Sequence, residues 1–318
     1  MAINSGRFVA VGIAPEATRG NAESSPTDYI RWGELSLQDE TTTTVDNDAA
    51  GVLEMDNDAD NTMVMMNGSL GGNVRDKAFL RILQAALGRV TKSTDKYTFN
   101  TEQTPLQKSF TLFARDENNQ SYAFAGCILA SLTIRGGVNS YAGFTATFMG
   151  KKGTKISAPT LRYVEERPFL PQTTGLMIGD AVANQSTKIT RYELRLVKSE
   201  EPAMFLNTDT PDDFVTTGME ATGTIELITR DEQFKDQQLA NTKQKMLLSF
   251  LGKSRTESSK TLTPKIDIVH ERVMYERYNR NFNLDGLMTA TVDFRCLRSK
   301  DGTKFLSVEA TSFYNITS

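Results

Sequence analysis

The side chains that most often carry enzymatic chemistry are scarce in this sequence. The chain of 318 residues has one histidine, His270, and two cysteines, Cys127 and Cys296. Zinc sites draw on several thiolate or imidazole ligands, and nucleophilic catalysis needs a nucleophile beside a base. With one histidine and two cysteines distant from it in the sequence, we expect no zinc centre, Cys–His pair or Ser–His–Asp triad within one chain. His270 is in phase with Ile266 and Ile268 on the apolar side of a strand-like run, which predicts a packed or interface histidine.

An acidic run between residues 46 and 60 is the one cluster that suggests a cation site. An EF-hand calcium loop needs a glycine at its sixth position and a bidentate acid at its twelfth. A loop beginning at Asp56 would place Asn61 and Asn67 there, and neither fits. We interpret the run as a solvated acidic loop, with adventitious binding of a divalent cation as the alternative. Its members are Asp46, Asp48, Glu54, Asp56, Asp58 and Asp60.

Motifs for phosphate binding and sugar chemistry are equally weak. The sequence has no G-x-x-x-x-G-K-[ST] loop and no G-x-G-x-x-G run that opens a helix. Paired carboxylates for glycoside hydrolysis stay an open alternative. However, Trp32 is the only tryptophan, so little of the aromatic platform common at sugar sites is present. We expect no catalytic residue, no metal and no cofactor.

Composition and charge narrow the class of protein. Hydrophobic residues make up 39% and charged residues 24%, the balance of a globular protein with a core of useful size. The net charge of −3 opposes a sequence-independent grip on nucleic acid, because displacing counterions needs an excess of Lys and Arg. No stretch reaches the roughly 20 apolar residues that span a bilayer. Residues 1–8 lack the pattern of a secretory signal, so we expect cytosolic synthesis and two buried free thiols.

The elements that would position any site are mostly strands. Residues 1–28 are rich in glycine and proline and are expected to form an extended arm. Residues 40–61 carry few large apolar side chains and are expected to form a surface loop or hairpin tip. One helix is predicted from Asp76, its N-cap, to Leu87, with Gly88 as its C-terminal cap. The strands expected in this half cover residues 29–39, 63–70, 109–115, 122–135 and 141–150.

The same order of elements returns in the second half. A helix is expected from Asp231 to Leu251, closed by Gly252. The strands expected here cover residues 190–199, 221–229, 265–272, 287–297 and 305–314. We therefore divide the chain into an arm at 1–28, a first domain at 29–155, a linker at 156–185 and a second domain at 186–318.

Residues in register favour a duplication of the two halves. Both halves carry the pattern G-[ST]-[LI]-x4-R-D-x2-F where a strand meets a helix, and each predicted helix closes with Leu-Gly. A shorter match aligns Thr145-Ala146-Thr147 with Thr289-Ala290-Thr291. Coincidence is the alternative, because glycine at strand ends and aspartate at helix starts are common. The longer pattern consists of Gly68, Arg75, Asp76 and Phe79, and of Gly223, Arg230, Asp231 and Phe234.

These features resemble the major tail tube proteins of long-tailed bacteriophages. The arm sequence Pro15-Glu16-Ala17-Thr18-Arg19-Gly20 is similar to that family's E-[TS]-x-[YW]-G opening, although Arg19 stands where the family often has an aromatic residue. Tyr29–Gly33 then enters the first strand. The polar loop, the strand with Gly68 and one helix follow in the family's order. The resemblance runs from about residue 8 to the C-terminus if the second half is a second copy.

The resemblance implies a mainly β fold: two tandem β-sandwich or half-barrel domains, each with one flanking helix. In this family the inner strands of neighbouring subunits join into a large closed barrel around a lumen, and most rings hold six single-domain subunits. Pairing an edge strand with a neighbour's edge removes exposed backbone groups and closes a ring. A duplicated chain therefore predicts homotrimeric rings with pseudo-sixfold symmetry.

The resemblance also implies a structural virion protein of the phage tail, assembled in the host cytoplasm, and no enzyme. Its expected partners are copies of itself in stacked rings, the tape measure protein, the tail terminator and baseplate proteins. Double-stranded DNA should pass without specific binding, which acidic or neutral lumen residues would favour, and no membrane insertion is expected. Ring-to-ring contacts are predicted for the arm and for the acidic loop, at Asp46, Asp48, Leu53, Asp56 and Asp58.

Two other functions stay open from the sequence. One is a different ring-forming tail component, such as a terminator, a baseplate hub component or the inner tube of a contractile apparatus. The other is a carbohydrate-binding or enzymatic β-sandwich. Stacked rings would indicate a tube, isolated rings the first alternative, and a monomer that binds a sugar the second.

Overall fold

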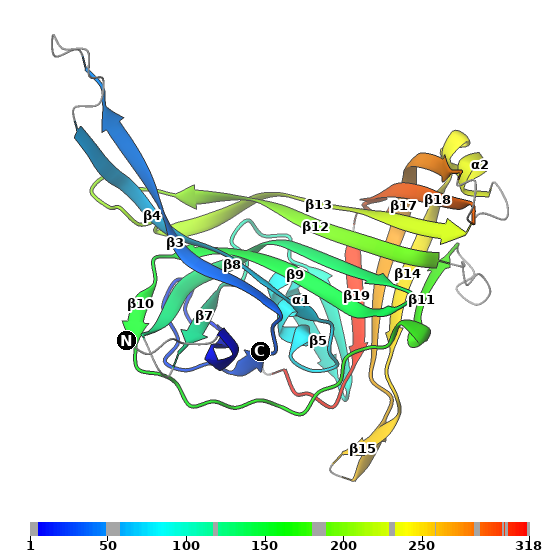
Figure 1. Ribbon diagram of the computed structural model, residues 1–318, viewed down its shortest axis with the longest axis horizontal. Coiled ribbons are helices and arrows are strands. Elements are labelled where there is room, and N and C mark those ends of the chain that lie inside the picture. Colours follow the sequence, from blue (N-terminus) through cyan, green and yellow to red (C-terminus); the bar gives the residue numbers. More distant parts are fainter. Residues whose placement is uncertain are drawn as a thin grey trace.

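The computed structural model describes residues 6–48, 58–116, 120–179, 189–228, 233–257, 259–282, 287–300, 302 and 305–316. These residues form a mainly β structure with two α-helices, α1 (Phe79–Leu87) and α2 (Gln233–Leu239). Long antiparallel strands cross the molecule, and the hairpin of β3 and β4 projects from one end (Figure 1). The mainly β fold with one helix in each half, predicted from the sequence, is confirmed for this part of the chain.

A short 3-10 turn, Gly6–Phe8, precedes the strands of the first half, and a second one, Pro171–Thr173, precedes those of the second half. The first half contains β1 (Ala10–Pro15), β2 (Asp28–Ile30), β3 (Glu34–Asp46), β4 (Asp58–Asn73), β5 (Gly88–Ser93), β6 (Lys96–Thr101), β7 (Phe110–Arg115), β8 (Ser121–Gly137), β9 (Ser140–Lys151) and β10 (Thr154–Ile156). The second contains β11 (Thr174–Ile178), β12 (Ile189–Ala203), β13 (Asp213–Ile228), β14 (Lys243–Leu251), β15 (Arg255–Glu257), β16 (Lys260–Leu262), β17 (Lys265–Asn281), β18 (Thr289–Leu297) and β19 (Leu306–Thr311).

One continuous layer of strands, which we call the long sheet, runs through both halves. Its order is β3-β4-β9-β8-β12-β13-β18-β17, and the pairing of β8 with β12 joins the halves. The N-terminal parts of β8 and β17 pair elsewhere: β8 with β7 and β10, and β17 with β14 and β19. A bulge lies between Leu129 and Ser131 in β8 and between Tyr275 and Arg277 in β17. Because an extra residue bends a strand, these bulges mark where each strand leaves the long sheet.

The two halves repeat the same ladder of strand pairs. The strand order is β3-β4-β9-β8 in the first half and β12-β13-β18-β17 in the second. In the same way, the pairing of β1 with β7 corresponds to the pairing of β11 with β14. Gly68 on β4 and Gly223 on β13 hold equivalent places in this ladder. The residues opposite them are Leu37 and Phe148 for Gly68, and Leu194 and Phe294 for Gly223.

Both glycines allow a close approach of the neighbouring backbone. A Cβ on Gly68 would lie 2.5 Å from the carbonyl oxygen of Ser36, and a Cβ on Gly223 would lie 2.4 Å from that of Glu193. Ser36 and Glu193 are themselves equivalent, since each stands one residue before the leucine opposite its glycine. The glycine of the sequence pattern therefore has the same steric reason in both halves.

The shorter sequence match is out of register. Because Phe148 and Phe294 both lie opposite the equivalent glycines, Thr145 is equivalent to Thr291 and not to Thr289. The predicted alignment of Thr145-Ala146-Thr147 with Thr289-Ala290-Thr291 is wrong by two residues. The misaligned residues still lie on the same face of the sheet, because side chains alternate with a period of two along a strand.

The predicted second helix is wrong over most of its length. Of its described residues, only Gln233–Leu239 are helical, and Lys243–Leu251 form strand β14 between β11 and β17. Residues Met246 to Phe250 are buried in succession. A short, continuously buried apolar run gives no periodicity that separates a strand from a helix. Gly252 accordingly follows a strand and caps no helix.

The predicted N-cap of the first helix is also wrong, whereas its C-cap is confirmed. The helix begins at Phe79, and the Oδ1 atom of Asp76 instead accepts a hydrogen bond from the backbone N–H of Arg167 at 2.9 Å. The orphan N–H of Ala78 donates to Oε2 of Glu166 at 3.0 Å, which supplies the negative charge that a helix N-terminus favours. Gly88 has φ of 84°, and its N–H bonds the carbonyl of Gln84.

The expected N-terminal arm contains a strand that the sequence did not predict. β1 lies between β2 and β7, and its Val11 and Ile13 are fully buried. Most buried apolar residues of both halves form one large cluster, to which Phe79 contributes by packing on Phe144 with ring centroids 5.0 Å apart. Within the described chain, neither helix has the length and apolar content of a membrane-spanning segment.

Candidate assembly interface

The long sheet ends in two strands with open edges. In the described chain, β3 pairs only with β4, and residues 277–281 of β17 pair only with β18. The side of β17 opposite β18 is occupied by β14 only as far as Met274. Gln238 of α2 covers the bulge by donating a hydrogen bond to the carbonyl of Glu276 at 2.9 Å. Beyond that point both edges present backbone donors and acceptors for a further strand.

The two edges carry opposite charge. β3 contains acidic residues and no basic one: Glu34, Asp39, Glu40 and Asp46. The end of β17 contains Arg277 and Arg280. The Arg277 side chain is 68% exposed, and its nearest acidic contact is Asp293 at 3.9 Å. Strand pairing between such edges would therefore bring unlike charges together.

The junction of β8 with β12 shows how two halves join inside one chain. Leu132 lies opposite Leu196 and Ile134 opposite Leu194, and all four are buried. On the other face Arg135 lies opposite Glu193. Apolar pairs thus seal one face of this junction while a pair of unlike charges lies on the other.

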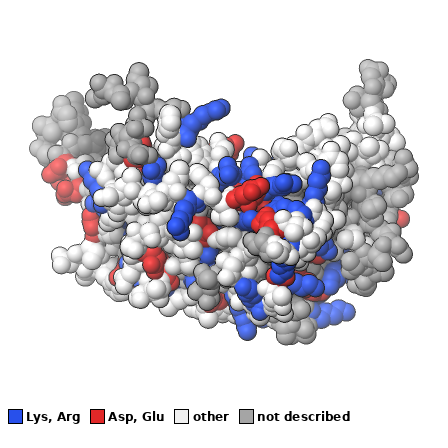
Figure 2. All heavy atoms as spheres, turned by 90° about the horizontal axis from the view of Figure 1, so that it is seen from below, with Lys and Arg blue, Asp and Glu red and all other residues white. Residues whose placement is uncertain are grey.

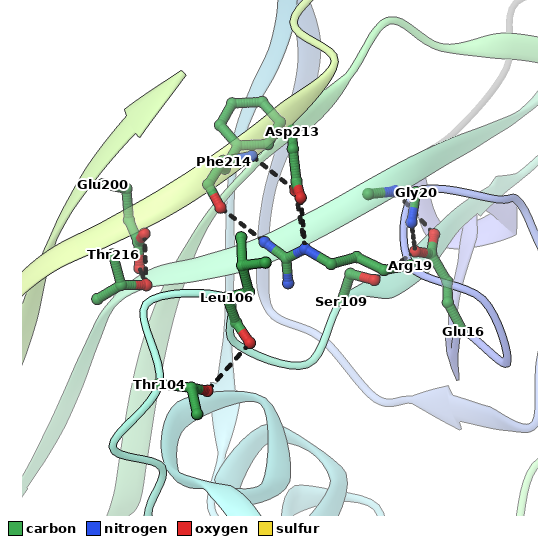
Figure 3. Close-up of polar contacts among 11 residues, drawn as sticks. Glu16, Arg19, Gly20, Thr104, Leu106, Ser109, Glu200, Asp213, Phe214 and Thr216 are labelled. Carbon is green, nitrogen blue, oxygen red and sulfur yellow. Dashed lines mark hydrogen bonds and ion pairs between the residues drawn. The ribbon is translucent and has the colours of Figure 1, made fainter. Parts of the chain in front are cut away.

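The motif in the N-terminal arm is built around a buried carboxylate. Oε2 of Glu16 accepts hydrogen bonds from the N–H of Gly20 at 2.7 Å and from the Ser109 hydroxyl at 2.5 Å (Figure 3). Its Oε1 accepts from the N–H of Gly126 at 2.7 Å and from the Thr111 hydroxyl at 3.0 Å. Gly20 has φ of +77°, a conformation that favours glycine. Glu16 and Gly20 of the motif therefore fix the turn that follows β1.

Arg19 then links this turn to the second half. Its Nε donates to both carboxylate oxygens of Asp213 at 2.8 Å, and its Nη2 donates to the carbonyl of Phe214 at 2.6 Å (Figure 3). Asp213 begins β13, so the arm holds the base of the second hairpin against the first half. A charged, planar guanidinium suits this contact because it bonds a carboxylate and a carbonyl at once.

Lys198 is a buried cation that no motif in the sequence singles out. It lies on β12, is 4% exposed, and donates to Oε1 of Gln107 at 2.8 Å and to the carbonyl of Ala85 at 3.3 Å. Burial lowers the pKa of Lys198 from its ordinary value of 10.5 to about 8. The lysine therefore bridges the two halves at the cost of holding a proton in an apolar site.

Lys198→Met should flatten the alkaline rise in stability. With a folded pKa below the unfolded one, the unfolded chain binds more protons between about pH 8 and 10.5, so the free energy of unfolding rises with pH there. Relative to the variant, the wild type should gain roughly 3 kcal/mol across this window. Denaturant unfolding at several pH values measures the difference, with the exposed Lys253→Met as the control. Parallel pH profiles for wild type and Lys198→Met would contradict the assignment.

The face of the long sheet that points away from the core is rich in hydroxyl and amide groups. Some of its charged groups have close partners: Arg295 contacts Glu276 at 2.6 Å and Glu220 at 2.9 Å, and the Thr224 hydroxyl donates to Asp293 at 2.9 Å. On the side of the molecule drawn in Figure 2, both signs of charge are also interspersed. The uncharged members of the sheet face are Ser36, Gln38, Asn67, Ser69, Ser131, Thr133, Thr145, Thr147, Thr222, Thr224 and Thr291.

The residues of the repeat pattern take structural places. Phe79 and Phe234 each pack on an aromatic ring, Phe234 edge-on to Tyr275 with centroids 5.4 Å apart. Arg75 lies 3.7 Å from a carboxylate oxygen of Glu166, and Asp76 pairs with an arginine, Arg255, at 2.5 Å. Arg230 and Asp231 lie outside the described residues, so this part of the repeat stays a prediction.

The described ends of the acidic run, Asp46, Asp48, Asp58 and Asp60, lie at the far end of the projecting hairpin. Asp46 lies opposite Asp58 in the β3–β4 ladder, and Asp48 donates its N–H to Oδ1 of Asp46 at 3.1 Å. Leu53 and Asp56 lie outside the described residues. Like charges directly opposite each other destabilise a strand pair, so Asp46 and Asp58 weaken this end of the ladder. The described residues contain no group of three His, Cys, Asp or Glu side chains placed to hold a metal ion.

The histidine and both cysteines are buried, as the sequence predicted. His270 is fully buried, and burial lowers its pKa to about 3, so the ring is neutral. Cys127 and Cys296 are free thiols whose pKa values burial raises. Such thiols are poor nucleophiles.

The sequence reasoning missed the residues that form and support the sheet edges. Arg277 and Glu40 have no local motif, because a strand edge is defined by which strands pair and not by residue type. Glu16 and Gly20 stood in the quoted arm motif, but their contacts to β7 and β8 depend on long-range pairing. The one signal in the sequence that points to these residues is the repeat, because it indicates which strands of the two halves are equivalent.

Comparison with known proteins supplies the family. A family model described as phage tail tube protein matches residues 6–296. No curated protein matches the chain. The match covers the arm motif, the long sheet and both halves of the repeated ladder.

Proposed function

The chain belongs to the phage tail tube protein family, and on this premise we propose that three copies form a ring that stacks into the tail tube. The family is one of structural virion proteins. The observation that carries the proposal is the duplicated ladder with oppositely charged open edges on β3 and β17. Three chains supply six equivalent half-chains. Head-to-tail contacts between them form a closed ring when the rotation from each half-chain to the next adds up to a full turn.

The tube is proposed as the conduit through which double-stranded DNA leaves the virion. The polar face of the long sheet supports this role if it lines the lumen. Its basic side chains alternate with acidic ones, since Arg135 lies opposite Glu193 and Arg295 contacts Glu220 and Glu276, and many of its other side chains are short hydroxyls and amides. DNA affinity grows with each phosphate that a cation neutralises, so a neutral lining lets the duplex slide. The tape measure, tail terminator and baseplate proteins are the proposed partners at the ends of this tube.

End-on electron microscopy of the purified, assembled protein tests the proposal. The expected result is stacked rings with threefold symmetry and six similar lobes, and a mass of three chains per ring by light scattering. Rings of six chains would contradict the trimer. Isolated rings that never stack would instead favour a terminator or hub component. A monomer at every concentration would overturn assembly altogether.

Ring-to-ring contact is proposed for the projecting β3–β4 hairpin. β1 is buried within the subunit, so within the described arm only the exposed residues before and after β1, Phe8 among them, are available for such contacts. Replacing residues 45–59 by an Asn-Gly turn would join Thr44 to Asp60, which are already paired. We expect rings of normal mass but no tubes, seen by light scattering and negative-stain microscopy. Tubes of normal length from this variant would exclude the hairpin as the stacking contact.

A further inference from the structure

The junction inside one chain provides a template for the junction between chains. β8 and β12 pair antiparallel with outer-face pairs and core-face pairs in alternation. The outer-face pairs are Ser131–Val197, Thr133–Arg195 and Arg135–Glu193, and the core-face pairs are Leu132–Leu196 and Ile134–Leu194.

The repeated ladder assigns each residue of this junction an equivalent at the open edges. On β8 and β17, Leu129 and Tyr275 both lie opposite the equivalent phenylalanines just before the bulge. Ser131 is therefore equivalent to Arg277, and Thr133 to Asn279. On β12 and β3, Leu194 and Leu37 both lie opposite the equivalent glycines. The residues equivalent to Glu193, Arg195 and Val197 are therefore Ser36, Gln38 and Glu40.

Resting on the proposed ring, we infer that the C-terminal part of β17 of one copy pairs antiparallel with β3 of the next in the register of the β8–β12 junction. Its partner is thus a second copy of this chain. The outer-face pairs are Arg277–Glu40, Asn279–Gln38 and Asn281–Ser36. The core-face pairs are Tyr278–Asp39 and Arg280–Leu37, with Phe282 opposite Leu35.

The chemistry of the two edges fits this register. Arg277, 68% exposed in the single chain, meets the exposed carboxylate of Glu40. Phe282, 73% exposed, meets Leu35, which is only partly covered by the core. None of these residues took part in deriving the register, which used only the glycines, phenylalanines and bulges.

A shift of two residues would remove the Arg277–Glu40 pair. Moving β3 by two positions places Gln38 or Thr42 opposite Arg277, and Phe282 then lies opposite Gly33 or Leu37. The register with Thr42 opposite Arg277 also brings Arg280 opposite Asp39. A shift of one would turn the core-side residues Leu35 and Leu37 towards the outer face. Among these registers, the inferred one repeats the β8–β12 junction, keeps the face of every side chain and pairs Arg277 with Glu40.

Cysteine cross-linking of the assembled full chain tests the register. Directly opposed strand residues have Cα atoms about 4.5–5.5 Å apart, which a disulfide spans, whereas side chains two positions out of register lie about 7–8 Å apart. The variant Gln38→Cys with Asn279→Cys should give covalent trimers on a non-reducing gel after mild oxidation. Thr133→Cys with Arg195→Cys is the matched control, since it is the equivalent pair within one chain and should close without joining chains.

The shifted pair Ser36→Cys with Asn279→Cys should stay monomeric on the same gel. Rings that form without a 38–279 cross-link, or that cross-link in the shifted pair, would overturn the register and leave the ring intact. Failure of the unsubstituted protein to form any ring, in contrast, would count against the proposed function itself.

Discussion

Arg277→Glu should leave the chain folded and prevent its assembly at concentrations where the unsubstituted protein forms rings. The change puts a carboxylate opposite Glu40 in the inferred junction, and like charges directly opposite cost up to about 1 kcal/mol. A ring of three chains contains three such junctions, so the total is about 3 kcal/mol. The association constant of the trimer should fall roughly 100-fold, and the concentration needed for half-assembly should rise about tenfold, since it varies as the square root of that constant. Light scattering over a dilution series measures it.

A charge exchange separates this effect from a general loss of solubility or fold. Arg277→Glu combined with Glu40→Arg restores an unlike pair and should return assembly to near its original concentration. Arg89→Glu changes the net charge equally at an exposed position on β5, away from both edges, and should have little effect. Equal losses in Arg277→Glu and Arg89→Glu, or no recovery in the exchange, would show that residues 277 and 40 do not meet.

The sequence predicted the mainly β fold and the duplication because both depend on local patterns. The strand Thr289–Leu297 alternates buried and partly buried side chains as its period-two pattern indicated. The G-[ST]-[LI] part of the repeat fell on truly equivalent strands, since a glycine beside a close backbone approach has a steric cause in each half. The Thr-Ala-Thr match had no such cause, and it was out of register by two.

What the sequence did not predict depends on long-range pairing. β14 was taken for a helix because burial on both faces removes its periodicity. β1 was missed because Gly12 and Pro15 suggested an irregular arm, although Gly12 packs where a Cβ would lie 2.5 Å from Pro26. The open edges of β3 and β17 can be identified only once the pairing of all other strands is known. Arg277 and Glu40 therefore could not be predicted as edge residues from the sequence.

The equivalent glycines give a prediction in which the same substitution has two different outcomes. A Cβ at position 223 would lie 2.4 Å from both the carbonyl oxygen of Glu193 and the ring of Phe294, in the middle of the long sheet. Neither β12 nor β18 can move without breaking further pairs. Gly223→Ala should therefore lower the free energy of unfolding by about 3 kcal/mol or more.

A Cβ at position 68 would make a similar overlap, 2.5 Å from the carbonyl of Ser36, but β3 is an edge strand and can shift outward. Gly68→Ala should therefore cost the single chain only about 1 kcal/mol and should abolish rings, because the displaced β3 no longer fits its neighbour. Denaturant unfolding and light scattering on both variants measure the contrast, with Gly175→Ala, whose Cβ would meet nothing within 4 Å, as the control. Rings from Gly68→Ala at the normal concentration would mean that β3 is not an assembly edge, since the strain at Ser36 would then have no consequence outside the chain.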